Sequence, residues 1–315
     1  INDKQLLYKY LNKKYNFFSI IISYLKRLTT LISCSSSDLI YIEKELYPFL
    51  PYFIESLFLI NKKYILNYDD AVFDYYESHK NKLVRRILAK KHKFLMKNSC
   101  LTICGNRFLA NYAKDSGCKS IEILPTVINL KKYRKIKNHS NIEKPIICWI
   151  GSPSSLQHLK TIDAVFQELA KEKAFILKII GIKNYQLSNV EVICKEWSEE
   201  LEVNELITSD IGIMPLNKTR FSLGKCGYKI IQFMGTGLPV VASKLGENIN
   251  IINENKNGYL ANSKSEWIKF LKILLSDFKL RSKMGFEGRK IVENQFSIQS
   301  TKKTFISFFE KNIPR

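Results

Sequence analysis

The sequence contains no long hydrophobic run. Its most apolar stretch, Phe17–Leu25, is flanked by lysines and an arginine. It is well short of the roughly 20 apolar residues that cross a bilayer. The stretch therefore predicts an amphipathic or buried helix rather than a membrane span. Nor does any stretch show the order of charged, apolar and small residues that marks a cleavable secretion signal.

Disulfide and metal-binding patterns are also missing. The seven cysteines are an odd number, none forms a CxxC pair, and most lie in apolar runs. This usage predicts reduced, buried thiols in a reducing compartment such as the cytoplasm. The four histidines are scattered, so we expect no structural metal. The cysteines are Cys34, Cys100, Cys104, Cys118, Cys148, Cys194 and Cys226.

Acidic residues are few. The chain has 29 Asp and Glu and 50 Lys and Arg, which gives a net charge of +21. The basic excess peaks in Lys80–Lys97, which has no acidic residue and has apolar residues at helical spacing. Such a helix either lies on an anionic membrane surface or packs on the core with a solvated basic back, and both interpretations stay open. We expect no nucleic-acid binding, because the charge is diffuse and no helix-turn-helix or aromatic-rich RNA pattern accompanies it.

What the sequence does have is a regular alternation of short apolar runs with helical patterns. The runs are apolar on both sides of the strand, so they predict parallel sheets covered by helices on both faces. The length of 315 residues suggests two domains of this α/β class. The expected strands are Leu39–Ile42, Tyr64–Asn67, Leu101–Cys104, Ile121–Leu124, Ile146–Ile150, Phe175–Ile180, Val190–Cys194, Ile211–Leu216 and Pro239–Ala242.

Helical patterns fill the intervals between these runs. A polar segment at Ile128–Lys144 is expected to link the two domains. The C-terminal stretch Lys264–Phe309 predicts successive helices, and Ser297 is a suitable N-cap for the last of them. The other expected helices are Leu46–Leu59, Lys80–Met96, Arg107–Asp115, Leu156–Lys171, Glu199–Ile207 and Lys225–Met234.

The most informative stretch is Asp210–Ser243, which reads as strand, loop, helix, tight turn and strand. With a helix beginning near Gly224, the residues Lys225, Lys229 and Gln232 share one stripe. A helix N-terminus with two lysines is a plausible cradle for a diphosphate, and Gln232 would hydrogen-bond hydroxyls such as those of a ribose. The alternative is an ordinary solvated stripe on a surface helix.

Three loops are expected to meet this helix. Ligands of parallel sheets bind outside the carboxyl ends of the strands. The loop Gly151–Ser155, the residue Gly181 and the loop Asn217–Gly224 each follow a predicted strand. The sequence thus predicts one crevice lined by these loops and by the helix that carries Lys229.

The order and spacing of several segments resemble the family-4 glycosyltransferases (group 1 glycosyl transferases) of the GT-B fold, over nearly the whole chain. The resemblance implies two Rossmann-like domains whose parallel sheets face a cleft. It also implies that residues 1–137 form the acceptor-side domain, that residues 138–296 bind the donor, and that the helix 297–315 packs back toward the first domain. The segments are LIYIEKELYPFLP (39–51), NYDDAVF (67–73), CGNRFLANYA (104–113), ILPTVINLKKY (123–133), ICWIGSPSSLQHL (147–159), DIGIMPL (210–216), GKCGYKIIQFMGTGLPVVAS (224–243), NGYLA (257–261) and RKIVENQFS (289–297).

Such enzymes move a sugar from a nucleotide-diphosphate sugar, usually with retention, and the resemblance implies that they need no metal or other cofactor. Lys225 and Lys229 would stabilise the leaving diphosphate, with Lys225 also in a catalytic role. Met214 and Leu216 would line the base end, while Trp197 either lies near the base or only packs against the core. The implied donor-binding residues are Gly151, Ser152, Met214, Leu216, Gly224, Lys225, Tyr228, Lys229 and Gln232.

The sequence departs from the family pattern at two places. Many relatives carry two glutamates eight positions apart, where this chain has Gly224 and Gln232. Relatives also open with a strand and a glycine-rich loop, whereas this chain starts at a helical pattern, so we expect the first domain to be incomplete at its start.

In the first domain, Asp69 and Asp70 follow a predicted strand. They are either catalytic residues on the acceptor side or a cap of the next helix. Asn106 is an acceptor-side candidate, although the sequence favours a helix cap.

The function that these features favour is transfer of a sugar to a glycan or lipid-linked acceptor in bacterial surface polysaccharide synthesis, at the inner face of the membrane. Lys80–Lys97 would contact that anionic surface. The alternatives are a nucleotide-sugar epimerase or a phosphorylase on the same fold, or a catalytically inactive basic protein that binds membranes or nucleic acid.

Overall fold

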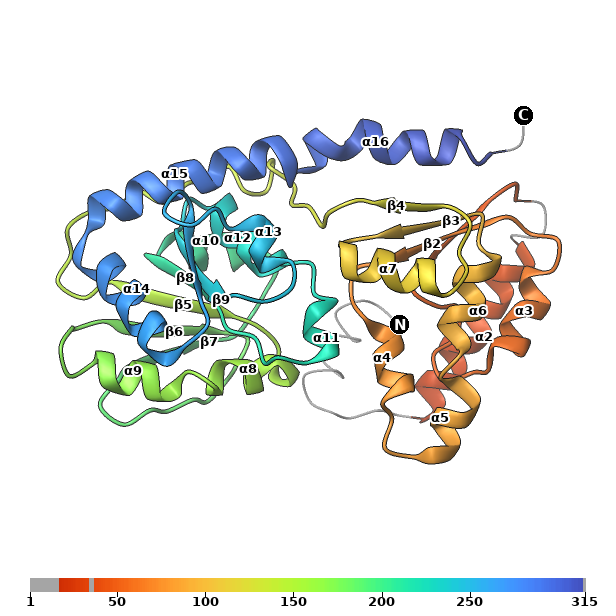
Figure 1. Cartoon of the computed structure of the whole chain (residues 1–315), viewed down its shortest axis with the longest axis horizontal. Coiled ribbons are helices and arrows are strands. Elements are labelled where there is room, and N and C mark those ends of the chain that lie inside the picture. Colours follow the sequence, from red (N-terminus) through yellow and green to blue (C-terminus); the bar gives the residue numbers. More distant parts are fainter. Residues whose placement is uncertain (1–16, 34–36, 314–315) are drawn as a thin grey trace. The chain divides into compact units, whose positions relative to one another are not determined.

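The structure is a computed structural model that describes residues 17–33 and 37–313 of the chain (Figure 1). Two compact units divide it. Unit 1 comprises Ile1–Leu124 and Ser307–Arg315, and unit 2 comprises Pro125–Ile306. Each unit is described by itself. The expected helical start of the chain and the thiol of Cys34 lie outside the described residues.

Unit 1 contains a four-stranded parallel sheet in the order β1-β2-β3-β4. The central strands β2 and β3 are apolar and almost wholly buried, as strands covered on both faces must be. All four strands were predicted to within a residue or two. They are β1 Ile40–Glu43, β2 Tyr64–Tyr68, β3 Leu101–Cys104 and β4 Ile121–Ile123.

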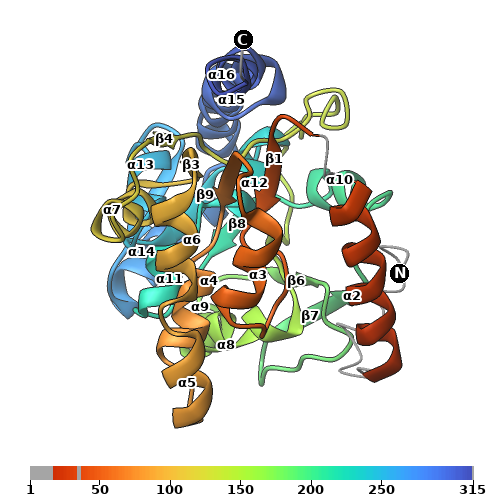
Figure 2. The same ribbon diagram turned by 90° about the vertical axis from the view of Figure 1, so that its right-hand side faces the viewer.

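The helices of unit 1 show two corrections. The helix predicted from Leu46 begins only at Tyr52, because Pro48 and Pro51 disfavour helical backbone before them and Phe49 takes a positive φ of 63°. The helix predicted for residues 80–96 is broken at Ala89 and Lys90. The helices α3 and α6 lie side by side (Figure 2). The rings of Tyr52 and Phe94 stack between them. The helices are α2 Phe17–Ser33, α3 Tyr52–Leu59, α4 Val72–Glu77, α5 Lys82–Leu88, α6 Lys91–Asn98 and α7 Arg107–Asp115.

Unit 2 contains a six-stranded parallel sheet in the order β10-β9-β8-β5-β6-β7. Five of these strands were predicted, although β8 stops at Met214 rather than at Leu216. The sixth, β10, was missed. The strands are β5 Ile146–Ile150, β6 Ile176–Ile180, β7 Glu191–Lys195, β8 Ile211–Met214, β9 Val240–Ser243 and β10 Gly258–Ala261.

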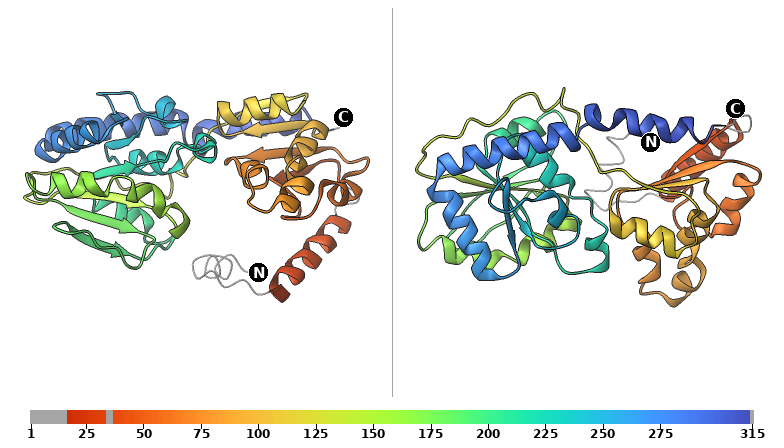
Figure 3. Two further views of the ribbon diagram at one scale, coloured as in Figure 1. Left: turned by 60° about the horizontal axis from the view of Figure 1, so that its bottom comes forward. Right: turned by 45° about the horizontal axis from the view of Figure 1, so that its top comes forward.

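Helices cover both faces of this sheet. Alternate side chains of β5 point to opposite faces, so Trp149 packs with one cluster and Cys148 with the other. The first cluster lies under α9 and α14, and the second under α10 and α12. The last three helices follow one another, as predicted (Figures 1 and 3). The helices are α8 Leu156–Lys160, α9 Asp163–Leu169, α10 Glu202–Ile207, α11 Arg220–Leu223, α12 Tyr228–Gly235, α13 Asn248–Ile251, α14 Lys264–Ser276, α15 Phe278–Gln295 and α16 Ile298–Glu310.

Two further predictions about the helices of unit 2 can be checked. The helix expected from Leu156 to Lys171 is interrupted at Thr161 and Ile162, where Ile162 turns into the core with φ near −115°. Ser297 caps the last helix, because its Oγ accepts a hydrogen bond from the backbone N–H of Ser300 at 3.0 Å. Of the described cysteines, three are buried and three are half-buried, and all are free thiols.

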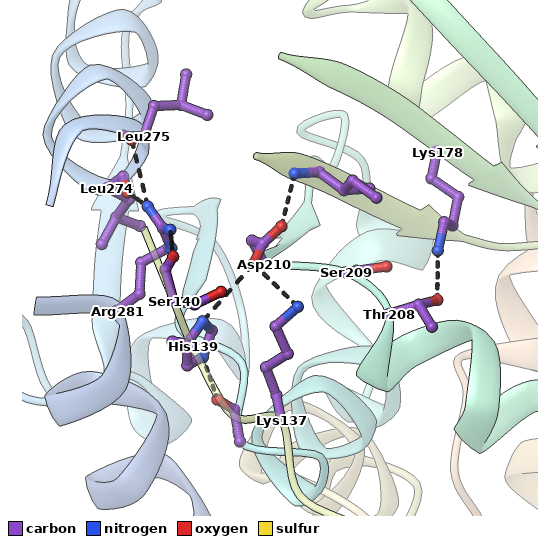
Figure 4. Close-up of polar contacts among 12 residues, drawn as sticks. Lys137, His139, Ser140, Lys178, Thr208, Ser209, Asp210, Leu274, Leu275 and Arg281 are labelled. Atoms are coloured by element: carbon purple, nitrogen blue, oxygen red, sulfur yellow. Dashed lines mark hydrogen bonds and ion pairs between the residues drawn. The ribbon is translucent and has the colours of Figure 1, made fainter. Parts of the chain in front are cut away.

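The segment that precedes β5 is pinned to the amino end of the unit 2 sheet through Asp210 (Figure 4). The fully buried carboxylate of Asp210 accepts a hydrogen bond from the backbone N–H of Ile146 at 2.8 Å. It also pairs with Lys137 Nζ at 3.1 Å. His139 lies beside this pair, and its Nε2 is 2.9 Å from the carbonyl oxygen of Gly237. The segment has no helix or strand over these residues, and side-chain bonds fix its path instead.

Candidate functional site

Two glycine loops meet at the carboxyl ends of β5 and β6. The N–H of Gly151 donates to the carbonyl of Ile180 at 2.9 Å, and the N–H of Gly181 donates to the carbonyl of Lys195 at 2.8 Å. Gly181 has a φ of +96°, and a Cβ there would overlap the carbonyl oxygen of Gly151. The backbones therefore touch, and the carboxyl ends of three neighbouring strands form one continuous floor.

Lys229, in the first turn of α12, lies over this floor. Its Nζ is 4.6 Å from the ring centroid of Trp149 and 3.4 Å from Ser155 Oγ. A Cβ on Gly151 would come within 2.6 Å of the same Nζ. The structure thus brings Gly151 and Lys229 together, as the sequence predicted.

Serine hydroxyls form a small cluster next to the lysine, which it meets at Ser155. Ser152 Oγ lies 2.9 Å from Ser154 Oγ and 3.4 Å from Ser155 Oγ. Hydroxyl groups can turn their protons toward an anion, and an ammonium group beside them adds positive charge. The loop and the lysine together have the chemistry of a phosphate-binding site.

Lys225 lies outside the helix predicted for it, and its Nζ is 5.0 Å from the ring centroid of Phe221. The helix α12 begins at Tyr228, not near Gly224, so Lys225, Lys229 and Gln232 do not form a single helical stripe. Gly224 ends the separate helix α11, and Gly227 takes a left-handed φ of +69° just before α12. These two glycines break the continuous helix that the spacing suggested.

His158 is a residue of this site that the sequence did not reveal. It is buried, and its Nδ1 accepts a hydrogen bond from the backbone N–H of Asn217 at 3.1 Å. Burial lowers the pKa of its imidazole, and the charges of Lys225 and Lys229 lower it further. Both lysines are therefore near enough to act on one neutral imidazole. A lone histidine in a helical pattern carried no signal of this role.

Gln232 lies deeper than predicted. It is 3% exposed, and its Nε2 donates to the phenol oxygen of Tyr133 at 3.0 Å. Tyr133 donates in turn to Glu202 Oε1 at 2.6 Å, and Trp197 Nε1 donates to Glu202 Oε2 at 2.8 Å. Tyr228 hydrogen-bonds to the same Tyr133 and exposes 42% of its surface. The sequence did not reveal Tyr133 or Glu202.

Met214 and Leu216 pack with the same hydrophobic cluster, the one under α12. Met214 is buried in the cluster under α12. Leu216 is half-buried and lines a cavity of about 380 Å³ near the carboxyl ends of β9 and β10, together with Ser243 and Trp267. Its N–H donates to Ser243 Oγ at 2.9 Å. Leu216 thus borders both this cluster and the cavity, whereas Met214 is buried within the cluster.

The predicted residues of unit 1 follow β2 and β3. Asp69 Oδ1 pairs with Lys44 Nζ at 2.6 Å. Neither Asp69 nor Asp70 caps α4, whose N-cap is Ala71 without a side-chain hydrogen bond. Asn106 does cap α7, because its Oδ1 accepts from the N–H of Leu109 at 2.9 Å. The favoured capping role of Asn106 is thus confirmed, and the capping alternative for the two aspartates is wrong.

Unit 1 also buries a charged group that the sequence did not suggest. Lys91 Nζ, with a fully buried side chain, lies 2.6 Å from Glu45 Oε2 and 2.8 Å from Glu55 Oε1. Glu45 accepts a hydrogen bond from the phenol of Tyr76 at 3.0 Å. Tyr76 in turn accepts the N–H of Phe49 at 2.9 Å. This group fixes the loop after β1, including the positive φ of Phe49.

Comparison with known proteins finds a family match in the second half of the chain. Residues 144–277 match the family model of glycosyl transferases group 1. Over these residues the chain is similar to the group 1 glycosyl transferases. A curated relative, spore coat protein SA of Bacillus subtilis (strain 168), is 24% identical over 174 residues. That match covers 52% of this chain and 38% of the relative, so the matching part spans well under half of the relative's length.

Solved glycosyltransferase structures share the fold of both units. Sucrose-phosphate synthase from Thermosynechococcus elongatus has a TM-score of 0.70 at 13% identity, covering 95% of this chain and 80% of that one. HepE of Anabaena, solved with UDP-glucose, has a TM-score of 0.69 at 12% identity, covering 90% and 82%. A glycosyltransferase from Rickettsia africae has a TM-score of 0.67 at 15% identity, covering 96% and 83%. The predicted α/β class with GT-B fold is confirmed.

Proposed function

We propose that this protein is a retaining glycosyltransferase that moves a sugar from a nucleoside-diphosphate sugar to a glycan or lipid-linked acceptor in bacterial surface polysaccharide synthesis. One observation carries the proposal. Lys229 lies beside the Gly151–Ser155 loop, and its charge and that of Lys225 both act on His158, within a stretch that matches the group 1 family. The sugar–phosphate bond of a donor would break at this point.

The lysines suit a reaction whose leaving group is a diphosphate. Negative charge on that group grows as the bond to the sugar breaks, so fixed cations nearby stabilise the transition state more than the bound donor. His158 stays neutral under the lysines and adds no competing charge. We propose that these groups do the work that a metal ion does in other transferases.

UDP is the first nucleotide to test. HepE was solved with UDP and glucose, and the TarM G117R mutant of S. aureus with UDP, fondaparinux and α-GlcNAc-glycerol. In the donor site proposed here, Lys225 and Lys229 hold the diphosphate, and Gln232, one turn further along α12, meets the ribose. Asp69 and Asp70 remain the proposed acceptor-side residues of unit 1.

A membrane surface is the proposed location of the acceptor. Leu83 and Ile87 of α5 are 62% and 48% exposed, and Arg86 lies between them in the chain. Exposed apolar residues among basic ones suit the interface of an anionic membrane. Among the described residues, no helix has the length and apolar character needed to cross a bilayer. We propose peripheral attachment at the cytoplasmic face.

A thermal-shift titration with UDP, GDP and ADP, each with and without an attached sugar, tests the donor site. We expect one nucleotide to raise the Tm of the wild type and to lose that effect in Lys225→Ala. Lys272→Ala, on the exposed face of α14, is the matched control and should keep the shift. An unchanged shift in Lys225→Ala would refute the phosphate assignment, and no shift with any nucleotide would refute donor binding. Product analysis with and without acceptor separates transfer from epimerisation.

A further inference from the structure

The side chain of Glu202 is an anion in an unusual setting. The residue is 5% exposed, yet its two oxygens are held mainly by neutral donors, the phenol of Tyr133 at 2.6 Å and Trp197 Nε1 at 2.8 Å. The one cation that pairs with it among the described residues is Lys132, whose Nζ is 3.8 Å from Glu202 Oε1. Burying a carboxylate is costly unless hydrogen bonds compensate, so this arrangement calls for a role beyond packing.

The hydrogen bonds around Glu202 can run in only one direction. A carboxylate only accepts and an indole N–H only donates. Tyr133 keeps its proton, because burial and the Glu202 carboxylate raise the pKa of its phenol well above the usual value. That single proton is directed to Glu202, so the oxygen of Tyr133 must accept. The Nε2 of Gln232, 3.0 Å away, therefore donates to this oxygen, as does the neighbouring phenol of Tyr228.

This direction fixes the amide of Gln232. With Nε2 committed to Tyr133, the carbonyl Oε1 is the atom that turns away from Tyr133. The nitrogen and oxygen of a side-chain amide are often hard to tell apart. Here they are assigned by the hydrogen bonds, because Glu202 can only accept, Tyr133 donates to Glu202, and Gln232 must therefore donate to Tyr133. Gln232 consequently presents an acceptor, as a carboxylate would at the same position.

The group borders the candidate phosphate site. Gln232 follows Lys229 by three residues on α12, which places the two side chains on neighbouring parts of one helix surface. Trp197 comes two residues after Lys195, whose carbonyl accepts the N–H of Gly181 in the floor of the site. A nucleotide whose diphosphate meets Lys229 would place its nucleoside on the side of Gln232 and Trp197.

We propose that Glu202 and Tyr133 are positioning residues that aim Gln232 Oε1 at a ribose hydroxyl of the donor nucleotide and hold the indole of Trp197 at the edge of the base site. The inference rests on the proposed function and deepens it. Its consequence is selectivity, because the site then favours a ribonucleotide over the analogue that lacks the hydroxyl.

Calorimetric titration with UDP, 2′-deoxy-UDP and 3′-deoxy-UDP tests this selectivity. We expect the wild type to bind UDP roughly threefold to tenfold more tightly than one of the two deoxy analogues, the effect of one hydrogen bond. In Tyr133→Phe the amide of Gln232 is released, so that preference should fall to about one. Tyr259→Phe removes the hydroxyl of another buried tyrosine of unit 2 and should keep the preference.

A swap of the two side chains gives a rescue test. Gln232→Glu places two carboxylates on either side of one phenol proton, and we expect it to weaken UDP binding about tenfold or more. Glu202→Gln combined with Gln232→Glu reverses the chain, since the new Gln donates to Tyr133 and still accepts from Trp197. The double variant should recover most of the affinity lost by the single one. This test remains decisive even where Tyr133→Phe fails to fold.

The outcomes separate the two proposals. UDP binding that depends on Lys225, with the same deoxy preference in Tyr133→Phe and no rescue by the swap, would overturn the positioning role and leave the donor site standing. Absence of binding by UDP, GDP and ADP would overturn both. A preference lost in Tyr133→Phe and affinity restored by the swap would support the inference.

Discussion

The ammonium group of Lys229 lies 4.6 Å from the centre of the indole ring of Trp149, a β5 residue that is 1% exposed. A cation over a buried indole gains electrostatic attraction from the ring face, more strongly than in water. The rigid core thereby holds a long, flexible side chain over the Gly151–Ser155 loop. Lys229 is arranged before any ligand arrives, which lowers the entropy cost of binding an anion.

Replacing Gly151 should disturb this arrangement. A Cβ at this position would lie 2.5 Å from the ring of Trp149 and 2.6 Å from Lys229 Nζ. Trp149 cannot move without repacking the core, so the lysine must leave. For Gly151→Ala we expect nucleotide affinity to fall about tenfold and stability to fall by about 1–3 kcal/mol.

Calorimetry and urea unfolding of the same Gly151→Ala preparation measure both effects. Gly117→Ala in unit 1 is a useful contrast, because a Cβ there would meet only Lys97, at an ordinary contact distance of 3.8 Å, and the cost would come from its φ of +82°. It should lower stability without lowering nucleotide affinity. Full affinity in Gly151→Ala would show that Lys229 does not contact the ligand.

His92 should make the protein sensitive to acid. Burial, followed by the charge of Lys91, lowers the pKa of its imidazole to about 3, whereas an unfolded histidine titrates near 6.5. The unfolded chain therefore binds the proton first, and stability that is complete above about pH 6.5 declines as the pH falls toward the folded pKa. Between pH 6.5 and pH 5 this amounts to about 2 kcal/mol.

The variant His92→Asn tests that dependence, since an amide can still donate to the phenol oxygen of Tyr68 that lies 2.8 Å from His92 Nδ1. The free energy of unfolding of each protein is measured in urea at pH 7.5 and at pH 5. Between these two values of pH the variant should lose about 2 kcal/mol less stability than the wild type. Equal changes in the two proteins would rule out a neutral, buried His92.

Asp210 should contribute strongly to the stability of unit 2, although it lies away from the candidate site. Asp210→Asn leaves the buried ammonium group of Lys137 without its counter-charge, and we expect a loss of about 2–4 kcal/mol. Asp277→Asn, an exposed N-cap that keeps its acceptor oxygen, should cost well under 1 kcal/mol. Thermal unfolding compares the two, and similar losses would contradict the importance of the Lys137–Asp210 pair.

Membrane attachment through unit 1 should depend on charge. Lys82, Arg86 and Lys90 are exposed on α5 and just before α6. Each basic residue near an anionic surface contributes about 1 kcal/mol, so changing all three to Gln should lower vesicle binding at least about tenfold. Co-sedimentation with phosphatidylserine vesicles at low and high salt measures this. The same change at Lys272, Lys279 and Lys283 of unit 2 is the control, and equal losses would argue against a specific surface.

Much of the fold could be predicted because strands that are buried on both faces consist of continuous runs of apolar residues. Nine of the ten strands in the described part of the chain appeared in this way, with shifts of at most two residues. The exception, β10, has only four residues and starts with Gly258, so it is too short to stand out. Its place is set by pairing with β9 rather than by its own pattern.

The candidate site was only partly predictable. The Gly151 loop and Lys229 were found because both adjoin strand ends that periodicity locates. The start of α12 was misplaced because it depends on the left-handed backbone of Gly227, where a Cβ would overlap Ile251. Glu202 and Tyr133 stand 69 residues apart in the sequence, and no local pattern links residues at that separation.

The pinned segment before β5 has a consequence for how the chain can be divided. Arg134 and Lys135 are exposed trypsin sites, but Tyr133 just before them is buried, and His139 just after them is held at Gly237. A single cut at Arg134 or Lys135 lies between the anchored residues Tyr133 and His139, so only the few residues between these two would lose their fixed positions. The two pieces should separate on a denaturing gel yet travel together in gel filtration. The same place could therefore serve as a split point for producing the protein as two co-folding fragments.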